Sequence, residues 1–219
     1  MRFLFYLSCA IFGLYIGAGL RQCTASASEV IRVGVIDTGY ADPDKTQLCP
    51  DTLATNLVDD DAVQHGTNMA RIIMSEAGDR HRYCLKIYKV FGKDGSFDAV
   101  AYLTALNDIM ATGIQVVNLS MSGYDVVVRE SFLVKRLLDL GVIVVAAAGN
   151  QGAYMSPKMC MFYPACIDPR IIVVGSRSLK SNIGPVVDFI ASGKYNGLQG
   201  TSISTARITG RIVKGDNAE

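Results

Sequence analysis

The sequence predicts an α/β fold in which a doubly wound, mostly parallel β-sheet carries helices on both faces. Short apolar runs rich in β-branched residues recur along the chain, and such near-continuous apolarity is typical of parallel strands buried on both faces. Segments of helical length lie between these runs. A chain that alternates strand and helix in this way connects parallel strands by right-handed crossovers.

The strands predicted in chain order are the apolar runs at 31–36, 85–91, 114–119, 142–147 and 171–175. In open parallel sheets, functional groups gather beyond the carboxyl ends of the strands. Three polar stretches directly follow predicted strands and are therefore candidate site segments: Asp37, residues 120–123 and the pair Gly149-Asn150.

The helices are predicted from apolar residues spaced three and four apart. The predicted helical segments are 67–76, 97–112, 131–140 and a last one over 203–210. Within 67–76, Met69, Ile72 and Ile73 would form the buried face.

Length and composition favour one globular domain. The chain has 219 residues, of which 50% are apolar and 19% are charged, a composition typical of a folded domain rather than a disordered one. The formal net charge is only +1, so the sequence gives no argument for a nucleic-acid partner.

The first residues have the layout of a secretory signal peptide. A basic N-terminus precedes the apolar run 3–20, and Ala25-x-Ala27 forms a small-residue cleavage motif. We therefore expect a signal peptide over 1–27 and a mature domain over 28–219. The mature protein would be secreted or periplasmic and would keep no membrane span.

Two alternatives to cleavage stay open. The apolar run is about long enough to anchor the chain in a membrane. Lipidation of Cys23 is a weaker alternative, because Arg21 places a charge where small or apolar residues would be expected.

The cysteines predict two disulfides. The chain has six cysteines, and loss of Cys9 and Cys23 with the signal peptide leaves 6 − 2 = 4. Four cysteines allow three pairings, and an even number in an exported protein favours disulfides over free thiols. Of the three we prefer Cys49–Cys84 with Cys160–Cys166, because each of these disulfides would close one loop between strands. No cysteine or histidine spacing of a structural zinc site is present.

Asp37 directly follows the apolar residues 33–36 in the stretch VGVIDTG, residues 33–39. An Asp-Thr-Gly at a strand end fits either an aspartic protease, whose aspartate works against a second one, or a serine protease whose aspartate orients a histidine. An aspartic protease needs a second Asp-Thr-Gly or Asp-Ser-Gly motif and has a mostly antiparallel β fold. The chain has neither, unless a homodimer supplied the second motif.

Three further residues supply the other groups of a serine-based site. His65 stands at the start of a predicted helix, and Ser202 stands where the last helix begins, beside free backbone N–H groups and a positive field. Asn150 follows a strand and carries a side-chain amide that can donate to an oxyanion. Taken alone, His65, Ser202 and Asn150 are explained equally well as a residue at a helix start, an N-cap and a turn residue.

Together these stretches resemble the subtilisin-like serine peptidases, the subtilase family. The matching stretches, in the family's order, are VGVIDTG, HGTNMARII, VVNLSMSG, VIVVAAAGN and GTSISTARITG. The resemblance covers essentially the whole mature chain and implies a subtilisin-like fold and a serine endopeptidase acting on polypeptides.

The resemblance also implies a role for each residue. Ser202 would attack the scissile carbonyl and form an acyl-enzyme. His65 would carry the proton, Asp37 would orient His65, and Asn150 with the Ser202 N–H would bind the oxyanion. The remaining site residues would pair with the substrate backbone and line an apolar pocket: Ser120, Met121, Ser122, Gly123, Ala147, Ala148 and Gly149.

No cofactor is expected. The acidic run Asp59-Asp60-Asp61 before His65 could favour basic substrates or bind a structural calcium, although a solvated acidic loop is the simpler interpretation.

The chain ends predict a short form of the family. There is no evident propeptide, and only 219 − 210 = 9 residues follow Gly210, so the last helix is expected to be short. A second copy or a partner could then cover exposed core surface. The rival function is a non-catalytic subtilase-like domain that binds peptides or a partner, but such a module has no physical need for the four groups Asp37, His65, Ser202 and Asn150.

Overall fold

Six strands form one sheet at the centre of the structure, a computed structural model that describes residues 30–79, 82–125 and 128–216. The strand order is β2-β1-β3-β4-β5-β6, and every neighbouring pair is parallel. The strands are β1 (Ile31–Asp37), β2 (Tyr83–Lys89), β3 (Val116–Leu119), β4 (Ile143–Ala147), β5 (Ile172–Ser176) and β6 (Phe189–Ala191).

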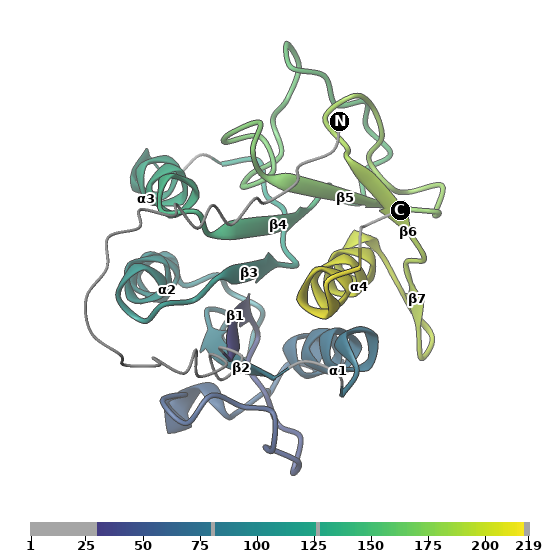
Figure 1. Ribbon diagram of the computed structural model, residues 1–219. Helices are drawn as coiled ribbons and strands as arrows, with labels where there is room; N and C mark the ends of the chain where they lie inside the picture. Colours follow the sequence, from purple (N-terminus) through teal and green to yellow (C-terminus); the bar gives the residue numbers. More distant parts are fainter. Residues whose placement is uncertain (1–29, 80–81, 126–127, 217–219) are drawn as a thin grey trace, which may run out of the picture.

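Helices cover both faces of this sheet. Figure 1 shows α2 and α3 on one face and α1 and α4 on the other, which confirms the doubly wound α/β prediction. The helices are α1 (His65–Ala77), α2 (Ala99–Ala111), α3 (Val128–Asp139) and α4 (Thr201–Lys214), with a short 3₁₀ turn η1 (Ala54–Asn56). A small antiparallel hairpin, β7 (Lys194–Tyr195) and β8 (Leu198–Gln199), leads into α4.

Each face of the sheet has its own apolar core. Val33 and Val35 of β1 belong to the core under α1 and α4, whereas Ile36 belongs to the core under α2 and α3. All three side chains are fully buried, and each contributes roughly 1.5–3 kcal/mol to folding relative to exposure. Burial on both faces explains why the strands appear in the sequence as continuous apolar runs.

The last helix is longer than the sequence analysis expected. It continues to Lys214 and ends at Gly215, whose φ of 79° is the left-handed conformation that glycine adopts readily. The Gly215 N–H bonds the carbonyls of Arg211 and Ile212. The expectation of a short helix after Gly210 was therefore wrong, because the final residues retain helical pattern and a C-cap.

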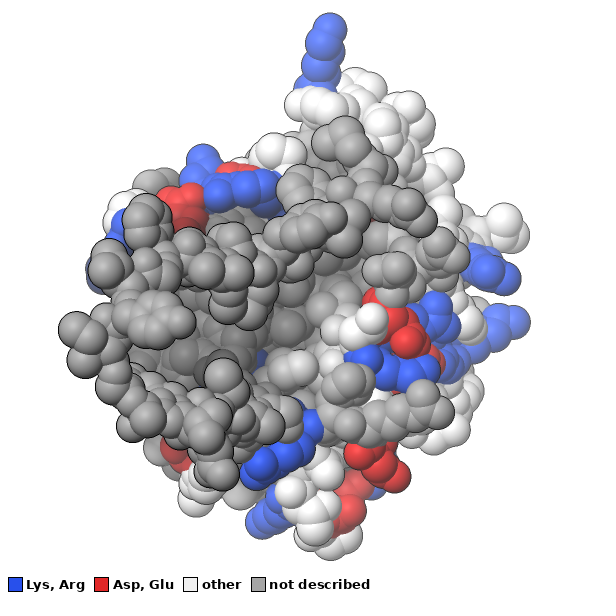
Figure 2. All heavy atoms as spheres, in the orientation of Figure 1, with Lys and Arg blue, Asp and Glu red and all other residues white. Residues whose placement is uncertain are grey.

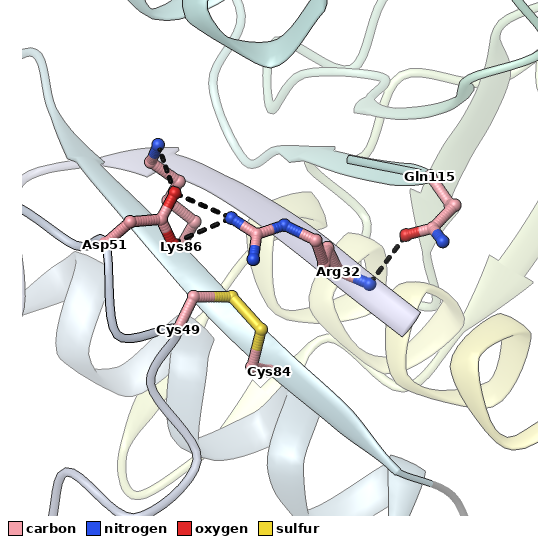
Figure 3. Close-up of a disulfide and its surroundings, with 6 residues drawn as sticks. All are labelled: Arg32, Cys49, Asp51, Cys84, Lys86 and Gln115. Atoms are coloured by element: carbon pink, nitrogen blue, oxygen red, sulfur yellow. Dashed lines mark hydrogen bonds and ion pairs between the residues drawn. A yellow bond between two sulfur atoms is a disulfide. The ribbon is translucent and has the colours of Figure 1, made fainter. Parts of the chain in front are cut away.

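Both disulfides of the preferred pairing are present, Cys49–Cys84 and Cys160–Cys166. Figure 3 shows the first of them, which ties the loop after β1 to the start of β2. Beside it, the Asp51 carboxylate accepts hydrogen bonds from Arg32 and from Lys86, the latter at 2.8 Å. Lys86 also pairs with Asp108 at 2.8 Å, so two carboxylates offset the free-energy cost of burying its charge.

Among the helices of the described ranges, none has both the length and the apolarity to cross a bilayer. The predicted signal peptide, residues 1–27, lies outside the described residues.

Candidate active site

Three adjacent strands bring the predicted site residues to one edge of the sheet. Asp37 is the last residue of β1, Ser120 follows β3, and Asn150 lies just beyond β4. Strand β3 pairs with both β1 and β4, so these carboxyl ends are neighbours. His65 is the first residue of α1 and Ser202 the second of α4. The topology therefore brings the four predicted catalytic residues and Ser120 together at one edge of the sheet.

Asp37 and His65 form the best-defined contact of the site. The Nδ1 atom of His65 lies 2.7 Å from Oδ1 of Asp37, and the backbone N–H of Thr38 donates to the same oxygen at 2.8 Å. The Asp37 side chain is only 2% exposed, against 29% for His65. Because an ionised carboxylate can only accept, Nδ1 carries the proton and Nε2 is the atom available to act as a base.

The start of α1 is fixed by side-chain acceptors. The first three N–H groups of the helix, residues 65–67, donate in order to Asp61, Thr38 and Asp59, at 3.0, 2.8 and 2.8 Å. The Thr38 hydroxyl also donates to Asp59 at 2.8 Å, and Asp59 is only 5% exposed. The simpler interpretation of 59–61 as a solvated loop was therefore wrong for Asp59, which joins the end of β1 to the start of α1.

Two glycines allow this junction to be tight. A Cβ atom on Gly66 would lie 2.4 Å from the carbonyl oxygen of Gly39 and 3.1 Å from Cβ of Asp37. Gly39 has a φ of 119°, and a Cβ there would lie 2.1 Å from the carbonyl oxygen of Val58. Only glycine fits at either position, and this close approach of helix to turn is what places His65 against Asp37.

Ser202 makes a different contact from the one its predicted role requires. Its Oγ donates to the carbonyl oxygen of Ser120 at 2.8 Å, while the Ser120 hydroxyl donates to the carbonyl of Ser202 at 3.1 Å. Within the described ranges, no hydrogen bond joins Ser202 to His65. Both residues nevertheless line the same cavity of about 300 Å³, and a rotation about one side-chain bond changes the partner of a serine hydroxyl.

A buried polar pair holds α4 against β3. Asn118 donates to the Ser120 hydroxyl at 2.9 Å and accepts from the Thr209 hydroxyl at 3.0 Å. Asn118 and Thr209 are both 0% exposed, so this network fixes the helix that carries Ser202. The sequence analysis missed Asn118 and Thr209, because no local pattern links residues 91 positions apart.

Asn150 presents its amide to the same cavity. Its Oδ1 accepts the N–H of Thr201 at 2.9 Å. A backbone N–H can only donate, so the atom facing it is the oxygen and Nδ2 remains available as a donor. A Cβ atom on Gly200 would lie 3.3 Å from Nδ2, so Gly200 leaves room beside this donor. Asn150 and Ser202 line one cavity, the arrangement that an oxyanion site needs.

The surroundings of His65 set its pKa. Burial disfavours the charged imidazolium and by itself lowers the pKa. The charge of Asp37 and its hydrogen bond outweigh burial, and the carboxylates of Asp61 and Asp59 add to their effect. The net result is a pKa raised above the ordinary value of 6.5.

The predicted substrate segment divides into two parts. Met121, Ser122 and Gly123 line a hollow of about 430 Å³ that aromatic side chains also line. Gly123 exchanges both backbone hydrogen bonds with Tyr163, at 2.9 and 2.8 Å. By contrast, Ala147 and Ala148 are 1% and 0% exposed. A Cβ atom on Gly149, where φ is 100°, would lie 2.7 Å from Asn182.

One carboxylate of the acidic run, Asp59, is held by hydrogen bonds within the protein. In the part of the chain that the structure describes, no three His, Cys, Asp or Glu side chains converge to hold a metal ion. Both oxygens of Asp59 accept hydrogen bonds from Thr38 and Thr67, so this carboxylate serves the junction between β1 and α1.

Known proteins with similar sequences are serine proteases. The model of the Subtilase family, Peptidase S8, matches residues 28–214. The Major intracellular serine protease of Bacillus subtilis (strain 168) is 29% identical over 218 residues, which cover 84% of this chain and 67% of that protein. Subtilisin DY of Bacillus licheniformis is 27% identical over 206 residues, which cover 82% of this chain and 74% of that protein.

Solved structures with similar folds give the same picture. A lanthipeptide protease has a TM-score of 0.67 at 21% identity, with 84% of this chain and 72% of that chain covered. A cold adapted subtilisin-like serine proteinase has a TM-score of 0.66 at 23% identity, with 84% of this chain and 74% of that chain covered. These likenesses establish the subtilisin-like fold. Together with the family match, they show that the chain belongs to the subtilase family of serine-type endopeptidases.

Proposed function

We propose that this chain cleaves polypeptides with Asp37, His65 and Ser202 as a catalytic triad and with an acyl-enzyme formed on Ser202. One observation carries the proposal. The Asp37–His65 pair, the Ser202 hydroxyl and the Asn150 amide come from four elements of the fold and three of these residues line one cavity.

The mechanism follows from the hydrogen bonds of these groups. Ser202 Oγ attacks the scissile carbonyl as its proton passes to Nε2 of His65, and the buried Asp37 carboxylate stabilises the imidazolium. Nδ2 of Asn150 and the N–H of Ser202 bind the oxyanion. Since Ser202 is the second residue of α4, its N–H has no acceptor within the helix. His65 then protonates the leaving amine, and water releases the acyl group.

The Ser202–Ser120 contact couples this chemistry to substrate binding. The resemblance assigns residues 120–123 to the substrate backbone, but Gly123 already pairs with Tyr163, so pairing falls to 120–122. A substrate N–H that bonds the carbonyl of Ser120 competes with the Ser202 hydroxyl for this acceptor. Substrate binding would thereby release the Ser202 hydroxyl toward His65. Ala147, Ala148 and Gly149 would line the pocket for the substrate side chain that precedes the scissile bond.

Active-site labelling tests the proposal. The full chain with both disulfides intact is treated with a fluorophosphonate probe and analysed by mass spectrometry, with Ser202→Ala as the control. We expect one adduct on Ser202 and none in the control. A folded wild-type chain that stays unlabelled would overturn the proposal.

A second candidate function is peptide binding without hydrolysis. The bond between the Ser202 hydroxyl and the carbonyl of Ser120 favours it, because this hydroxyl is not activated while it donates there. The labelling experiment separates the two, since a binding domain keeps an unreactive Ser202.

The proposal includes export, with cleavage after residue 27. The Cys49–Cys84 and Cys160–Cys166 disulfides support it, because disulfides persist in oxidising compartments outside the cytosol. N-terminal sequencing of the protein recovered from its natural source is expected to start at Ser28. A chain found in the cytosol with residues 1–27 attached would contradict export. Two similar proteins are named as intracellular.

A further inference from the structure

A second hollow adjoins the cavity of Ser202 and His65. Its volume is about 650 Å³, enough for one or two amino-acid side chains. The two cavities share Asn150, Gln199 and Gly200 as common lining. A peptide bound at Ser202 can therefore extend into the hollow without a break.

Three positive side chains surround this hollow, Arg177, Lys180 and Lys194. All three are exposed, and no ion pair to any of them occurs within the described residues. No Asp or Glu lines the hollow. Unbalanced positive charge around a concave surface focuses its field on the interior and attracts anions.

The neighbouring surface of α1 and α4 shows the opposite arrangement. There, Arg207 and Arg211 of α4 both bond the carboxylate of Glu76. Figure 2 shows positive and negative side chains intermixed over this side of the molecule, while Lys and Arg alone project at the right-hand edge near β7. The positive charges around the hollow are thus not a general property of this surface.

The backbone holds the three positive residues in place. The N–H of Arg177 bonds the carbonyl of Ala191 at 3.2 Å, and the carbonyl of Lys180 accepts the N–H of Gly152 at 2.8 Å. Lys194 lies in the β7–β8 hairpin and pairs with Gln199. Gln199 precedes Ser202 by three residues. The backbone segments that carry the three charges are therefore held beside the hollow.

The position of the hollow assigns it to one side of the scissile bond. In the proposed function, residues 120–122 hold the acyl part of the substrate, on the side where Ser120 contacts Ser202. None of these residues lines the hollow, which instead lies beyond Asn150 and Gly200. The hollow therefore faces the part of the substrate that leaves with the amine.

We propose that this cationic hollow binds carboxylate side chains in the first residues after the scissile bond, so that the enzyme prefers substrates with Asp or Glu on the leaving side. This inference rests on the proposed function. Each exposed charge pair contributes at most about fivefold to binding, so the combined preference arises from several modest contacts. It weakens at high salt, because ions screen exposed charges.

Matched peptides test the preference. Two peptides share the acyl half and differ after the cut, with Asp and Glu in one and Asn and Gln in the other. We expect kcat/KM to be higher for the acidic peptide by about tenfold at low salt, and the ratio to approach one in about 1 M salt. Hydrolysis of the shared acyl-enzyme is expected to be the same for both, because the leaving half has already departed.

Removing the three positive charges tests whether the preference for the acidic peptide comes from this hollow. The test variant carries Arg177→Gln, Lys180→Gln and Lys194→Gln. The matched control removes the same charge from exposed sites elsewhere, with Lys45→Gln, Lys135→Gln and Lys158→Gln. The ratio of acidic to neutral peptide is expected to fall toward one in the first variant and to keep its wild-type value in the control. Equal loss in both would overturn the proposal, because net charge alone would then explain the preference.

A binding measurement separates this inference from the proposed catalysis. Full-length Ser202→Ala is titrated with a dye-labelled acidic peptide, and anisotropy reports binding without turnover. The expected result is tighter binding of the acidic than of the neutral peptide, and loss of that difference in the charge-neutralised variant. Binding that inorganic phosphate abolishes at equal concentration would show a general anion site and would overturn the inference. Failed labelling would remove the proposed catalysis but leave this comparison intact.

Discussion

The two halves of the candidate active site are held in different ways. On the base side, His65 already contacts Asp37, and the start of α1 is fixed by acceptors from the end of β1 and from the loop before the helix. On the nucleophile side, α4 is fixed as firmly, through Asn118 and Thr209. There, however, the Ser202 hydroxyl donates to a backbone carbonyl instead of to the base.

The difference shows which part of the site is preorganised. A hydrogen-bonded pair with a buried carboxylate, such as Asp37–His65, would be expensive to reorganise during the reaction, and its contact is already formed without substrate. The hydroxyl needs one bond rotation and loses one hydrogen bond, a net cost of about 0.5–1.5 kcal/mol. The substrate can offset this cost by taking over the carbonyl of Ser120.

The largest effect is expected from removing the base, His65, or the nucleophile, Ser202. His65→Ala and Ser202→Ala should each lower kcat for peptide hydrolysis by about 10⁶-fold, and the double variant should lose little more, because the two groups act as a unit. Steady-state kinetics on a fluorogenic peptide measures all three variants. Additive losses would show that Ser202 and His65 do not act together.

The next effect alters the orientation of the base. Asp37→Asn keeps the shape of the side chain but removes the negative charge and offers His65 a hydrogen-bond donor, so it should lower kcat by about 10⁴-fold. The thermal midpoint serves as the folding control. A loss below tenfold in a folded variant would show that Asp37 is a structural residue only.

A smaller effect concerns the oxyanion. Asn150→Ala removes the Nδ2 donor and should lower kcat by about 10²–10³-fold with little change in KM. Because Asn150 also accepts the N–H of Thr201, Asn150→Asp keeps this acceptor and serves as the second variant. Full activity in both would place the oxyanion elsewhere.

The support of α1 can be tested separately from the chemistry. Asp59→Ala leaves the N–H of Thr67 and the hydroxyl of Thr38 without their acceptor, and should reduce the free energy of unfolding by about 1–3 kcal/mol. Denaturant titration measures this change. The control is Asp60→Ala, because Asp60 is exposed and pairs with Lys89 instead of with the helix N–H groups. Equal stability of the two variants would contradict the role assigned to Asp59.

The smallest effect is on pH dependence. In the proposed mechanism neutral His65 is the base, and its pKa is raised, so kcat/KM should rise as pH increases through a midpoint above the ordinary value of 6.5. Asp61→Asn keeps the helix cap but removes a carboxylate that raises the pKa, so the midpoint should move down. The interactions that raise this pKa stabilise the fold below the unfolded-state value, and this stabilisation is lost as pH rises through the folded-state pKa. A midpoint that does not move in Asp61→Asn would contradict the cause assigned here.

The sequence predicts the central sheet, and the position of polar residues at its edge, for a shared physical reason. Strands buried on both faces show up as apolar runs, and the polar residue that follows such a run lies at the carboxyl edge of the sheet, as Asp37 and Asn150 do here. The short strand β6 and the β7–β8 hairpin lack this signal, because two or three residues carry no periodicity.

The supporting contacts could not be predicted in the same way. Asn118 and Thr209 meet only because α4 packs across β3, and Asp59 is buried only because α1 begins beside the turn after β1. In the sequence they look like a strand residue, a helix residue and part of an acidic loop. Which polar residue supports a site depends on tertiary contacts that local patterns do not contain.

A crystal structure of the fluorophosphonate adduct tests most directly the claim that Asp37–His65 is ready before Ser202 is. The expected structure has the phosphorus bonded to Ser202 Oγ, the Ser120 carbonyl released and a phosphonyl oxygen within hydrogen-bond distance of Asn150 Nδ2. The Nδ1–Oδ1 distance of His65 and Asp37 should remain near 2.7 Å. An adduct whose oxygen points away from Asn150, or a His65 that has left Asp37, would contradict the account.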